Sequence, residues 1–425
     1  MSNKSFEQVC LDIYKSISPK AFKAIVPVID WARKMQNKAP IPLKEKMAEI
    51  TFPKFDKKII MIHGVSVGEV LSLEKLIKRI KEEFKEYGIV ITTGTQTGQE
   101  LAKKKYGEIA DFITYFPIDI YECTKRFLNK INPSIILIAE TELWPNFARC
   151  AKEKNIPLYI INGRISDDSY PAYLKIKKFF KPVLSCFEGI YCQSEIDKNR
   201  FLELGGRYDK TEVMKNLKFE IDKILVEQDL IIKDNSSKIF IAGSTHSGED
   251  EIILRVYRKL KKKIKNLKLI IAPRHLTRIE QVKYCIEQYN FSYGLRTLKN
   301  DLIKNDIIIL DTLGELSKFY AIADIAFIGG SFNKTGGHNP LEATIYSKPT
   351  ISGPSIKNFK DIYSILTHEG ASFVSNCEEE FFNIACMLLS DEVFYKKISN
   401  NCKNCFENQQ GALDFLIGKL KEKLN

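Results

Sequence analysis

Two successive series of short apolar runs, each followed by a polar loop and a stretch of helical spacing, constrain this chain more than any other feature. The first series begins with residues 58–63 (KIIMIH) and continues with residues 88–93 (GIVITT). Between these runs, apolar residues recur every three or four positions over residues 69–87, which predicts a helix. Strands that alternate with helices form parallel sheets with crossover connections. We therefore predict an α/β protein.

The remaining strand candidates fall into two groups. The first group comprises residues 112–116, 134–139, 157–161 and 189–192, and the second comprises residues 239–242, 267–272, 306–310, 324–328 and 349–352. A polar stretch at residues 233–238 separates the groups, and 425 residues exceed the size of one ordinary core. We predict two Rossmann-like, doubly wound domains, over residues 58–225 and 226–425, which face a central cleft.

Residues 1–57 precede the first strand and are predicted to form an appended helical segment. Its most apolar stretch, residues 21–31, is interrupted by Lys23, Pro27 and Asp30. It is too short to span a bilayer, which takes about 20 apolar residues. The stretch suits either an amphipathic segment on a membrane surface or an ordinary packing helix.

The composition narrows the classes of partner. The formal net charge of +12 suits nucleic acid, an anionic membrane or an acidic substrate, or simply reflects solvated lysines. No long Lys/Arg block and no interleaving of aromatic and basic residues is present, so we expect no nucleic-acid binding. The ten cysteines have no regular spacing, and the one C-x-x-C pair, Cys402 and Cys405, lacks a second pair that would complete a metal site. We expect reduced thiols.

Polar loops follow the strands of the first half. The loop H-G-V-S-V-G-E ends at Glu69, and Gly64 and Gly68 permit a tight turn before the helix. The Glu69 carboxylate either faces the cleft as a functional group or stabilises the start of the helix. Glu140 and Glu142 directly follow the apolar run SIILIA, where acidic residues are rarely needed for packing, so a functional role is favoured.

The second half carries a similar set of loops after its strands. They are G-S-T-H-S-G-E (residues 243–249), P-R-H (273–275), D-T-L-G-E (311–315) and, after G-G-S (329–331), G-G-H-N-P-L-E (336–342). A helix beginning at Asn339–Pro340 would bind a phosphate, and Glu342 would bind a ribose diol. A turn with a helix cap is the alternative for each loop, but several such loops at one sheet edge indicate a nucleotide site. No P-loop and no G-x-G-x-x-G motif is present.

Taken in order, these loops closely resemble those of the Kdo (3-deoxy-D-manno-octulosonic acid) transferases of lipopolysaccharide biosynthesis, a family of GT-B glycosyltransferases. The stretches that carry the resemblance run from His63 to Glu342, with a weaker match, N-Q-Q-G-A-L, that extends to Leu413. They are H-G-V-S-V-G-E, E-T-E-L-W-P-N, N-G-R-I-S, N-L-K-F, A-G-S-T-H-S-G-E, P-R-H, D-T-L-G-E-L and G-G-H-N-P-L-E. The N-terminal segment is more polar than the hydrophobic anchor that usually begins such proteins.

The resemblance implies an inverting transfer of Kdo from CMP-Kdo to the lipid A precursor, lipid IVA. Glu69 matches the general base (proton acceptor), and Glu140 and Lys218 match transition-state stabilisers. The residues that match CMP-binding positions are Pro273, Arg274, Leu313, Gly314, Glu315, Asn339, Pro340, Leu341 and Glu342. Further site candidates are Ser66, Gly68, His275, Gly336, Gly337 and His338.

The resemblance also implies which cofactors and partners the protein uses and where in the cell it works. One base suffices for a single displacement, and Lys218, Arg274 and a helix N-terminus would stabilise phosphate charge, so we expect no metal and no cofactor. The expected partners are CMP-Kdo, the lipid A precursor and an anionic membrane surface, at the cytoplasmic face of the bacterial inner membrane, held peripherally or monotopically rather than by a spanning helix. The alternative is another GT-B enzyme that uses a UDP-sugar.

Overall fold

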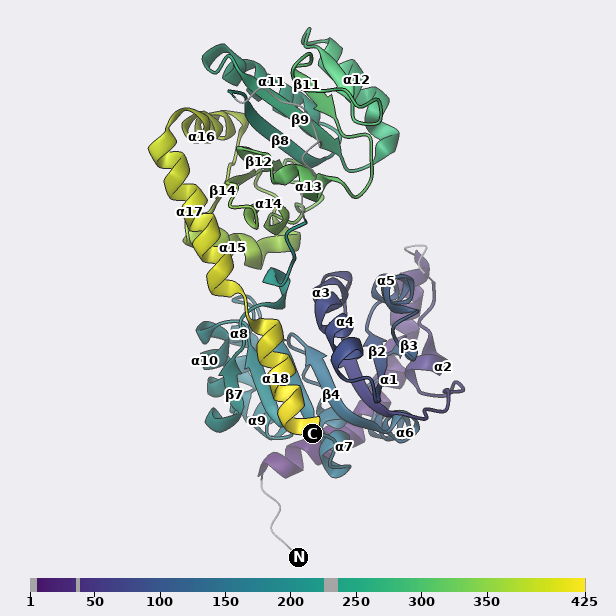
Figure 1. The fold of residues 1–425 in the computed structure, drawn as a ribbon. Helices are drawn as coiled ribbons and strands as arrows, with labels where there is room; N and C mark the ends of the chain where they lie inside the picture. The colour runs from purple at the N-terminus through teal and green to yellow at the C-terminus, as the bar shows by residue number, and fades with distance from the viewer. Residues whose placement is uncertain (1–5, 36–38, 225–235, 425) are drawn as a thin grey trace, which may run out of the picture. The chain divides into compact units, whose positions relative to one another are not determined.

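The computed structural model describes residues 6–35, 39–224 and 236–424, and the chain divides into two compact units. The first unit comprises residues 1–220 and 410–425, and the second comprises residues 221–409. Each unit holds a sheet of seven strands, some of which are labelled in Figure 1, and each strand pair is parallel. The predicted α/β class is therefore confirmed.

The sheet of the first unit has the order β3-β2-β1-β4-β5-β6-β7. Its strands are β1 (Lys58–His63), β2 (Tyr87–Thr93), β3 (Phe112–Tyr115), β4 (Pro133–Ala139), β5 (Leu158–Gly163), β6 (Gly189–Cys192) and β7 (Thr211–Val213). Along β1, Ile59 and Met61 enter one apolar cluster, whereas Ile60 and Ile62 enter another. Both faces of the strand are buried because helices cover both sides of the sheet, which explains why these strands are continuous apolar runs.

Eight helices that follow the strands belong to the first unit. They are α3 (Val67–Ser72), α4 (Glu74–Glu83), α5 (Gln96–Tyr106), α6 (Tyr121–Ile131), α7 (Pro145–Glu153), α8 (Tyr170–Lys175), α9 (Lys177–Leu184) and α10 (Glu195–Glu203), with 3-10 turns η1 (Tyr208–Lys210) and η2 (Leu217–Phe219). The single helix predicted over residues 69–87 is thus two helices that meet at Leu73. Its apolar spacing is kept because Val70, Leu76, Ile77 and Ile80 all face the core.

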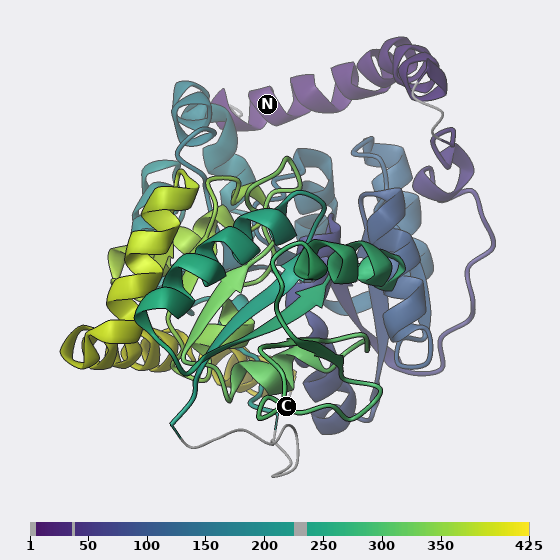
Figure 2. The same ribbon diagram turned by 90° about the horizontal axis from the view of Figure 1, so that it is seen from above.

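The N-terminal segment is helical, as predicted. Helix α1 (Phe6–Met35) continues through Pro19 and Pro27 and is followed by the short helix α2 (Leu43–Lys46). Figure 2 shows α1 as a long purple helix at the edge of its unit. It packs on α7 and α9, with Asp12 Oδ1 2.7 Å from Arg149 Nη1. None of the helices in the described ranges is both long and apolar enough to cross a bilayer.

The sheet of the second unit has the order β10-β11-β9-β8-β12-β13-β14. Its strands are β8 (Lys238–Thr245), β9 (Leu267–Pro273), β10 (Tyr293–Leu295), β11 (Ile307–Ile309), β12 (Ile325–Ile328), β13 (Thr350–Ser352) and β14 (Ser372–Val374). Its helices are α11 (Glu249–Lys263), α12 (Ile279–Glu287), α13 (Leu316–Tyr320), α14 (Leu341–Thr344), α15 (Lys360–His368), α16 (Glu378–Ser390) and α17 (Glu392–Gln409), with 3-10 turns η3 (Leu276–Arg278) and η4 (Lys357–Phe359). This sheet is also doubly wound (Figure 1).

The last helix, α18 (Ala412–Leu424), belongs to the first unit, whereas the sequence-based division assigned all of residues 226–425 to the second domain. Its apolar face explains the difference, because Leu416 and Ile417 enter the same apolar cluster as Ile60 and Ile62 of strand β1. The Lys419 ammonium also lies 2.8 Å from Oε1 of Glu212, a residue of β7. The predicted boundary at residues 225–226 lies outside the described residues, and the second unit begins at Ile221.

Candidate active site

The loop that follows β1 places Glu69 in the first turn of α3. Ser66 is the N-cap of this helix, and its hydroxyl donates to Glu69 Oε1 at 2.8 Å. The backbone N–H of Val65 donates to Glu69 Oε2, also at 2.8 Å. Both carboxylate oxygens are therefore fixed by the loop. Gly68 lies within α3, and a side chain there would meet only Ser66 Oγ at 3.9 Å, so the turn does not require a glycine at that position.

Two more carboxylates follow β4 and line the same hollow as Glu69. Glu140 has a positive φ of 59°, a conformation that costs energy for a residue other than glycine and that often marks functional sites. Glu142 follows two residues later. The hollow has a volume of about 260 Å³. Its lining residues are Glu69, Glu140, Thr141, Glu142, Arg164, Ser166, Ser169 and Tyr173.

The crowding of these carboxylates changes their acidity. Burial, and then the neighbouring Glu140 carboxylate, raise the pKa of Glu69, while hydrogen bonds from Val65 and Ser66 oppose that rise. Burial and the charge of Glu69 raise the pKa of Glu142 to about 7. A carboxylate whose pKa lies above its ordinary range is a better acceptor of protons near neutral pH. The hollow therefore holds a carboxylate suited to general-base chemistry.

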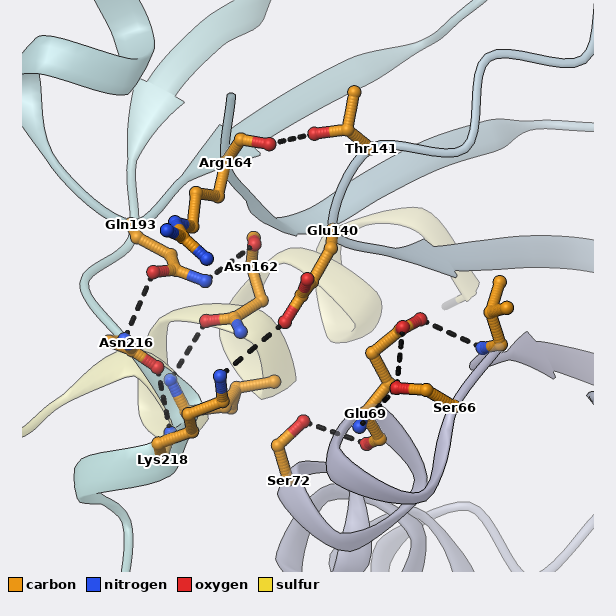
Figure 3. A network of polar contacts seen from close by, with 12 residues as sticks. Ser66, Glu69, Ser72, Glu140, Thr141, Asn162, Arg164, Gln193, Asn216 and Lys218 are labelled. Carbon is orange, nitrogen blue, oxygen red and sulfur yellow. Dashed lines mark hydrogen bonds and ion pairs between the residues drawn. The ribbon is translucent and has the colours of Figure 1, made fainter. Parts of the chain in front are cut away.

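A cation completes this group of side chains. Lys218 lies on the 3-10 turn η2, and its ammonium is 3.6 Å from Glu140 Oε1. Figure 3 shows Glu69, Glu140 and Lys218 around one space, with Asn162, Gln193 and Asn216 beside the lysine. The structure thus brings together the three residues for which the sequence predicted catalytic roles, although they are separated in the chain by up to 149 positions (218 − 69).

The predicted CMP-binding residues all lie in the second unit, at or after strand ends. Pro273 ends β9, and the N–H of the exposed Arg274 donates to the Thr245 carbonyl at 3.0 Å. In the loop before α13, Leu313 is 75% exposed and Gly314 has a φ of 83°. The Glu315 carboxylate accepts a 2.5 Å hydrogen bond from the Thr312 hydroxyl, so this loop is ordered around Glu315.

The glycine loop before α14 has a structural role that the sequence did not reveal. Gly336 and Gly337 have φ values of 101° and 76°, which glycine adopts readily. Their N–H groups donate to the Gly330 carbonyl at 3.1 and 2.7 Å, so these two donors already have partners. The Asn339 side chain caps the next turn by accepting from the Leu341 N–H at 3.1 Å.

Pro340 and Glu342 complete the predicted nucleotide segment. Pro340 is the N-cap residue of α14, and Leu341 begins that helix. Burial raises the pKa of Glu342, whereas the Arg274 guanidinium opposes the rise. This opposition places the charge of Arg274 within electrostatic reach of Glu342. Two predicted nucleotide-binding side chains from separate loops therefore share one region of the second unit.

Three histidines gather beside these residues. His246 Nε2 lies 2.8 Å from His338 Nε2, and the His246 and His275 ring centroids are 5.8 Å apart. Burial, and then Arg274, lower the pKa of His338 to about 4, so its imidazole is neutral at physiological pH. His63 belongs elsewhere: it is fully buried on Phe116 and its Nδ1 lies 3.0 Å from Thr92 Oγ1, so it is a structural histidine.

Glu249 is a residue of this region to which the sequence reading gave no role. It is 1% exposed, and its carboxylate accepts hydrogen bonds from four backbone N–H groups at 2.7–2.9 Å. The donors are His246, Gly330, Ser331 and Phe332. The sequence did hold a sign that Glu249 matters: it ends the loop G-S-T-H-S-G-E, just as Glu69 ends the loop H-G-V-S-V-G-E. Across the described ranges, no group of three or more His, Cys, Asp or Glu residues is arranged to hold a metal ion.

Comparison with known proteins shows the family of the chain. Residues 38–221 match the model of a family described as 3-deoxy-D-manno-octulosonic-acid transferase (kdotransferase). The 3-deoxy-D-manno-octulosonic acid transferase of Haemophilus influenzae is 34% identical over 373 residues, which cover 86% of this chain and 87% of that protein. The chain belongs to this family. The Kdo transferase resemblance expected from the loops is thereby confirmed, and the protein is a glycosyltransferase.

A second relative is longer than the chain described here. A bifunctional glycosyltransferase/methyltransferase of Fusobacterium nucleatum is 39% identical over 358 residues, which cover 81% of this chain and 55% of that protein. Among solved structures, a UDP-GlcNAc 2-epimerase from Neisseria meningitidis is similar with a TM-score of 0.55 at 17% identity, over 86% of this chain and all of that one. A glycosyltransferase from Rickettsia africae gives a TM-score of 0.53 at 16% identity, over 87% of this chain and 100% of that one. These likenesses confirm the GT-B fold.

Proposed function

We propose that this Kdo transferase family member moves Kdo from CMP-Kdo to the lipid A precursor, lipid IVA, by an inverting displacement. The observation that carries the proposal is the position of Glu69 in a hollow of about 260 Å³ that also holds Glu140, with Lys218 3.6 Å from Glu140. A base and a cation in one polar hollow suit the activation of a hydroxyl group next to a centre that gains charge.

The proposed reaction has one chemical step. The acceptor hydroxyl oxygen forms a bond to the anomeric carbon of Kdo while its proton passes to the Glu69 carboxylate. The bond between the anomeric carbon and the phosphate oxygen breaks, and CMP departs with the electron pair. A single displacement inverts the configuration of the anomeric carbon. Glu140 and Lys218 stabilise the transition state by their opposite charges, which the protein fixes before substrate binds.

The second unit supplies the proposed donor site. Arg274 offers a permanent positive charge for the CMP phosphate, and Glu342 is a hydrogen-bond acceptor for the ribose diol. The remaining CMP-binding candidates present backbone groups in the loops around residues 313–315 and 339–341. Because side-chain cations and backbone donors serve the phosphate, we propose that transfer needs no metal or other cofactor. Full activity in excess EDTA supports this part of the proposal, and activity that returns only with added Mg²⁺ contradicts it.

We further propose that the enzyme works at the cytoplasmic face of the inner membrane, held peripherally by α1. Ile25, Val28 and Trp31 of this helix are 53%, 63% and 65% exposed. The exposed residues Lys20, Lys23 and Lys34 lie on the same helix. Apolar side chains next to lysines suit the boundary between lipid headgroups and acyl chains. An acceptor embedded in lipid requires such contact.

A donor comparison tests the nucleotide part of the proposal. The purified protein is titrated with CMP and with UDP, and heat release and thermal stabilisation are recorded. The proposal predicts saturable binding of CMP that is lost when Arg274 is replaced by alanine, and much weaker binding of UDP. Tight UDP binding without CMP binding would instead favour a GT-B enzyme that uses a UDP-sugar.

A further inference from the structure

Lys218 is held in place by a chain of buried amide side chains that reaches across three strand ends. Asn216 precedes η2, and its Oδ1 accepts from the Lys218 N–H at 2.9 Å. Its Nδ2 donates to Gln193 Oε1 at 3.0 Å, and Gln193 Nε2 donates to the Asn162 carbonyl at 3.1 Å. Asn162 and Asn216 are fully buried, and Gln193 is nearly so. The turn that carries Lys218 is therefore tied to the ends of β5 and β6.

Asn162 closes this chain from the other side. Its side-chain Oδ1 accepts from the Leu217 N–H at 2.9 Å, so Asn162 and Asn216 together hold two successive N–H groups of η2. Asn162 has a φ of 53°, a left-handed conformation that asparagine adopts more readily than most residues. The backbone is thus bent at this point so that the amide reaches the turn.

One atom of this network has no partner in the protein. Asn162 Nδ2 is buried and finds no hydrogen-bond acceptor among the residues that the structure describes. Figure 3 shows the Asn162 side chain beside the Glu140–Lys218 ion pair. The other two buried side-chain atoms without a partner in the described ranges, Thr124 Oγ1 and Glu251 Oε2, belong to helices α6 and α11. A buried donor left unpaired destabilises the folded protein, so its retention calls for an explanation.

We propose that Asn162 is a further substrate-binding residue of this site, whose Nδ2 donates to an oxygen atom of the bound sugar substrate next to Lys218. The inference rests on the proposed transfer and adds a residue to it. The carbonyl half of the amide is anchored on the Leu217 N–H, which leaves the N–H half directed toward the ion pair. Asn162 therefore has two functions: its Oδ1 positions the turn of Lys218, and its Nδ2 binds substrate.

Two substitutions separate the donor from the rest of the side chain. Asn162→Asp keeps an oxygen for the Leu217 N–H but removes the donor, and Asn162→Gly removes the whole amide without adding a charge. Both residues tolerate the positive φ. Asn155 provides the matched control because it has a similar φ of 55° but is exposed and lies between α7 and β5. Asn155→Asp and Asn155→Gly report the cost of the same chemical changes away from the network.

The decisive experiment measures kcat and KM for Kdo transfer from CMP-Kdo in these four variants, in Lys218→Ala and in the double variant Asn162→Gly/Lys218→Ala. Both Asn162 variants should lose about 10- to 100-fold in kcat/KM, as expected for one hydrogen bond to a charged or polarised group. The Asn155 variants should behave as wild type. Adding Asn162→Gly to Lys218→Ala should still lower kcat/KM several-fold, because the Nδ2 donor contacts substrate directly, whereas a residue that acted only by positioning Lys218 would cause no further loss. Thermal unfolding and CMP titration of each variant monitor the fold.

The outcomes distinguish this inference from the proposal on which it rests. Wild-type transfer together with unchanged kcat/KM in both Asn162 variants overturns the inference and leaves the proposed function intact. An unchanged kcat/KM when Asn162→Gly is added to Lys218→Ala also overturns it, because Asn162 would then act only by positioning Lys218. A wild-type protein that binds CMP but transfers no Kdo contradicts the proposed function and the inference together.

Discussion

The Ser66 hydroxyl donates a 2.8 Å hydrogen bond to Glu69 Oε1, so the carboxylate proposed as the base also caps the helix in which it lies. The two interpretations that the sequence left open for Glu69, a functional carboxylate or a helix-capping one, are therefore compatible. Capping fixes both oxygens, and burial beside Glu140 raises the pKa of the group. A base that is held in one orientation before substrate binds loses little freedom in the reaction.

Glu69→Gln separates the two roles of this residue. The glutamine amide retains an oxygen that can accept from the Val65 N–H, so the temperature of unfolding should change little. An amide cannot take up the proton of the acceptor, and the transfer rate should fall by about 10²–10⁴. Initial rates at saturating donor, together with a thermal melt, measure both effects. Near-normal turnover in the glutamine variant would leave Glu69 as a cap only.

The raised pKa of Glu142 predicts how stability depends on pH. The pKa of its carboxyl group is about 7 in the folded protein, compared with an ordinary value of 4.5. Between these pH values the unfolded chain releases this proton before the folded one does, so the group lowers stability as pH rises. Glu142→Gln has no such titration. The difference in unfolding temperature, variant minus wild type, should therefore grow more positive from pH 4.5 to pH 7. A difference that stays constant with pH would contradict the assigned shift.

Glu249 is predicted to hold the loops of the donor site together. Replacement by alanine leaves four N–H donors without their acceptor, two of them buried, which should destabilise the protein by about 3 kcal/mol or more. CMP should bind more weakly because the loop at residues 330–332 loses its anchor. Chemical denaturation and CMP titration measure these effects, with Glu280→Ala as the control because the Glu280 side chain is 83% exposed. Unchanged CMP affinity would show that this loop does not support the nucleotide.

Membrane association through α1 predicts a dependence on both apolar and charged residues. Replacing Ile25, Val28 and Trp31 with serine should reduce cosedimentation with vesicles that contain anionic lipid, while activity on detergent-dispersed acceptor persists. Binding of the wild type should also weaken at high salt because lysine contributions are screened. Val393→Ser is the control, since Val393 is 81% exposed on helix α17 of the other unit. Equal binding of the triple variant would exclude this face of α1 as the contact.

Sequence patterns revealed the central strands of both sheets and the polar loops at their ends, because strands buried on both faces are long apolar runs. Strands β7, β10 and β14 were missed, since three residues at a sheet edge carry too little apolar periodicity to be recognised. The placement of α18 was missed for another reason. Its apolar face looks the same in sequence whichever unit it covers, and only the fold shows that Leu416 and Ile417 return to the first core.

In the site, too, the sequence predicted some residues but not the hydrogen bonds between them. Glu69, Glu140 and Lys218 were found through the resemblance of their motifs, and the structure brings them together. The buried amides Asn162 and Asn216 lie within two of those motifs, but hydrogen bonds across strand ends follow from the three-dimensional course of the chain. The Gly330 carbonyl accepts from the N–H groups of Gly336 and Gly337, and the motifs alone did not show this contact between two loops.

Mass measurement of the acceptor after incubation tests the central claim most directly. Wild-type protein and Glu69→Gln are each supplied with CMP-Kdo generated in the reaction and with tetra-acylated lipid A precursor. The account predicts that the wild type converts the precursor to a species heavier by one or more Kdo residues and releases CMP, whereas the variant leaves the precursor unchanged within the same time. An unmodified precursor with the wild type, or equal conversion by Glu69→Gln, would contradict the account.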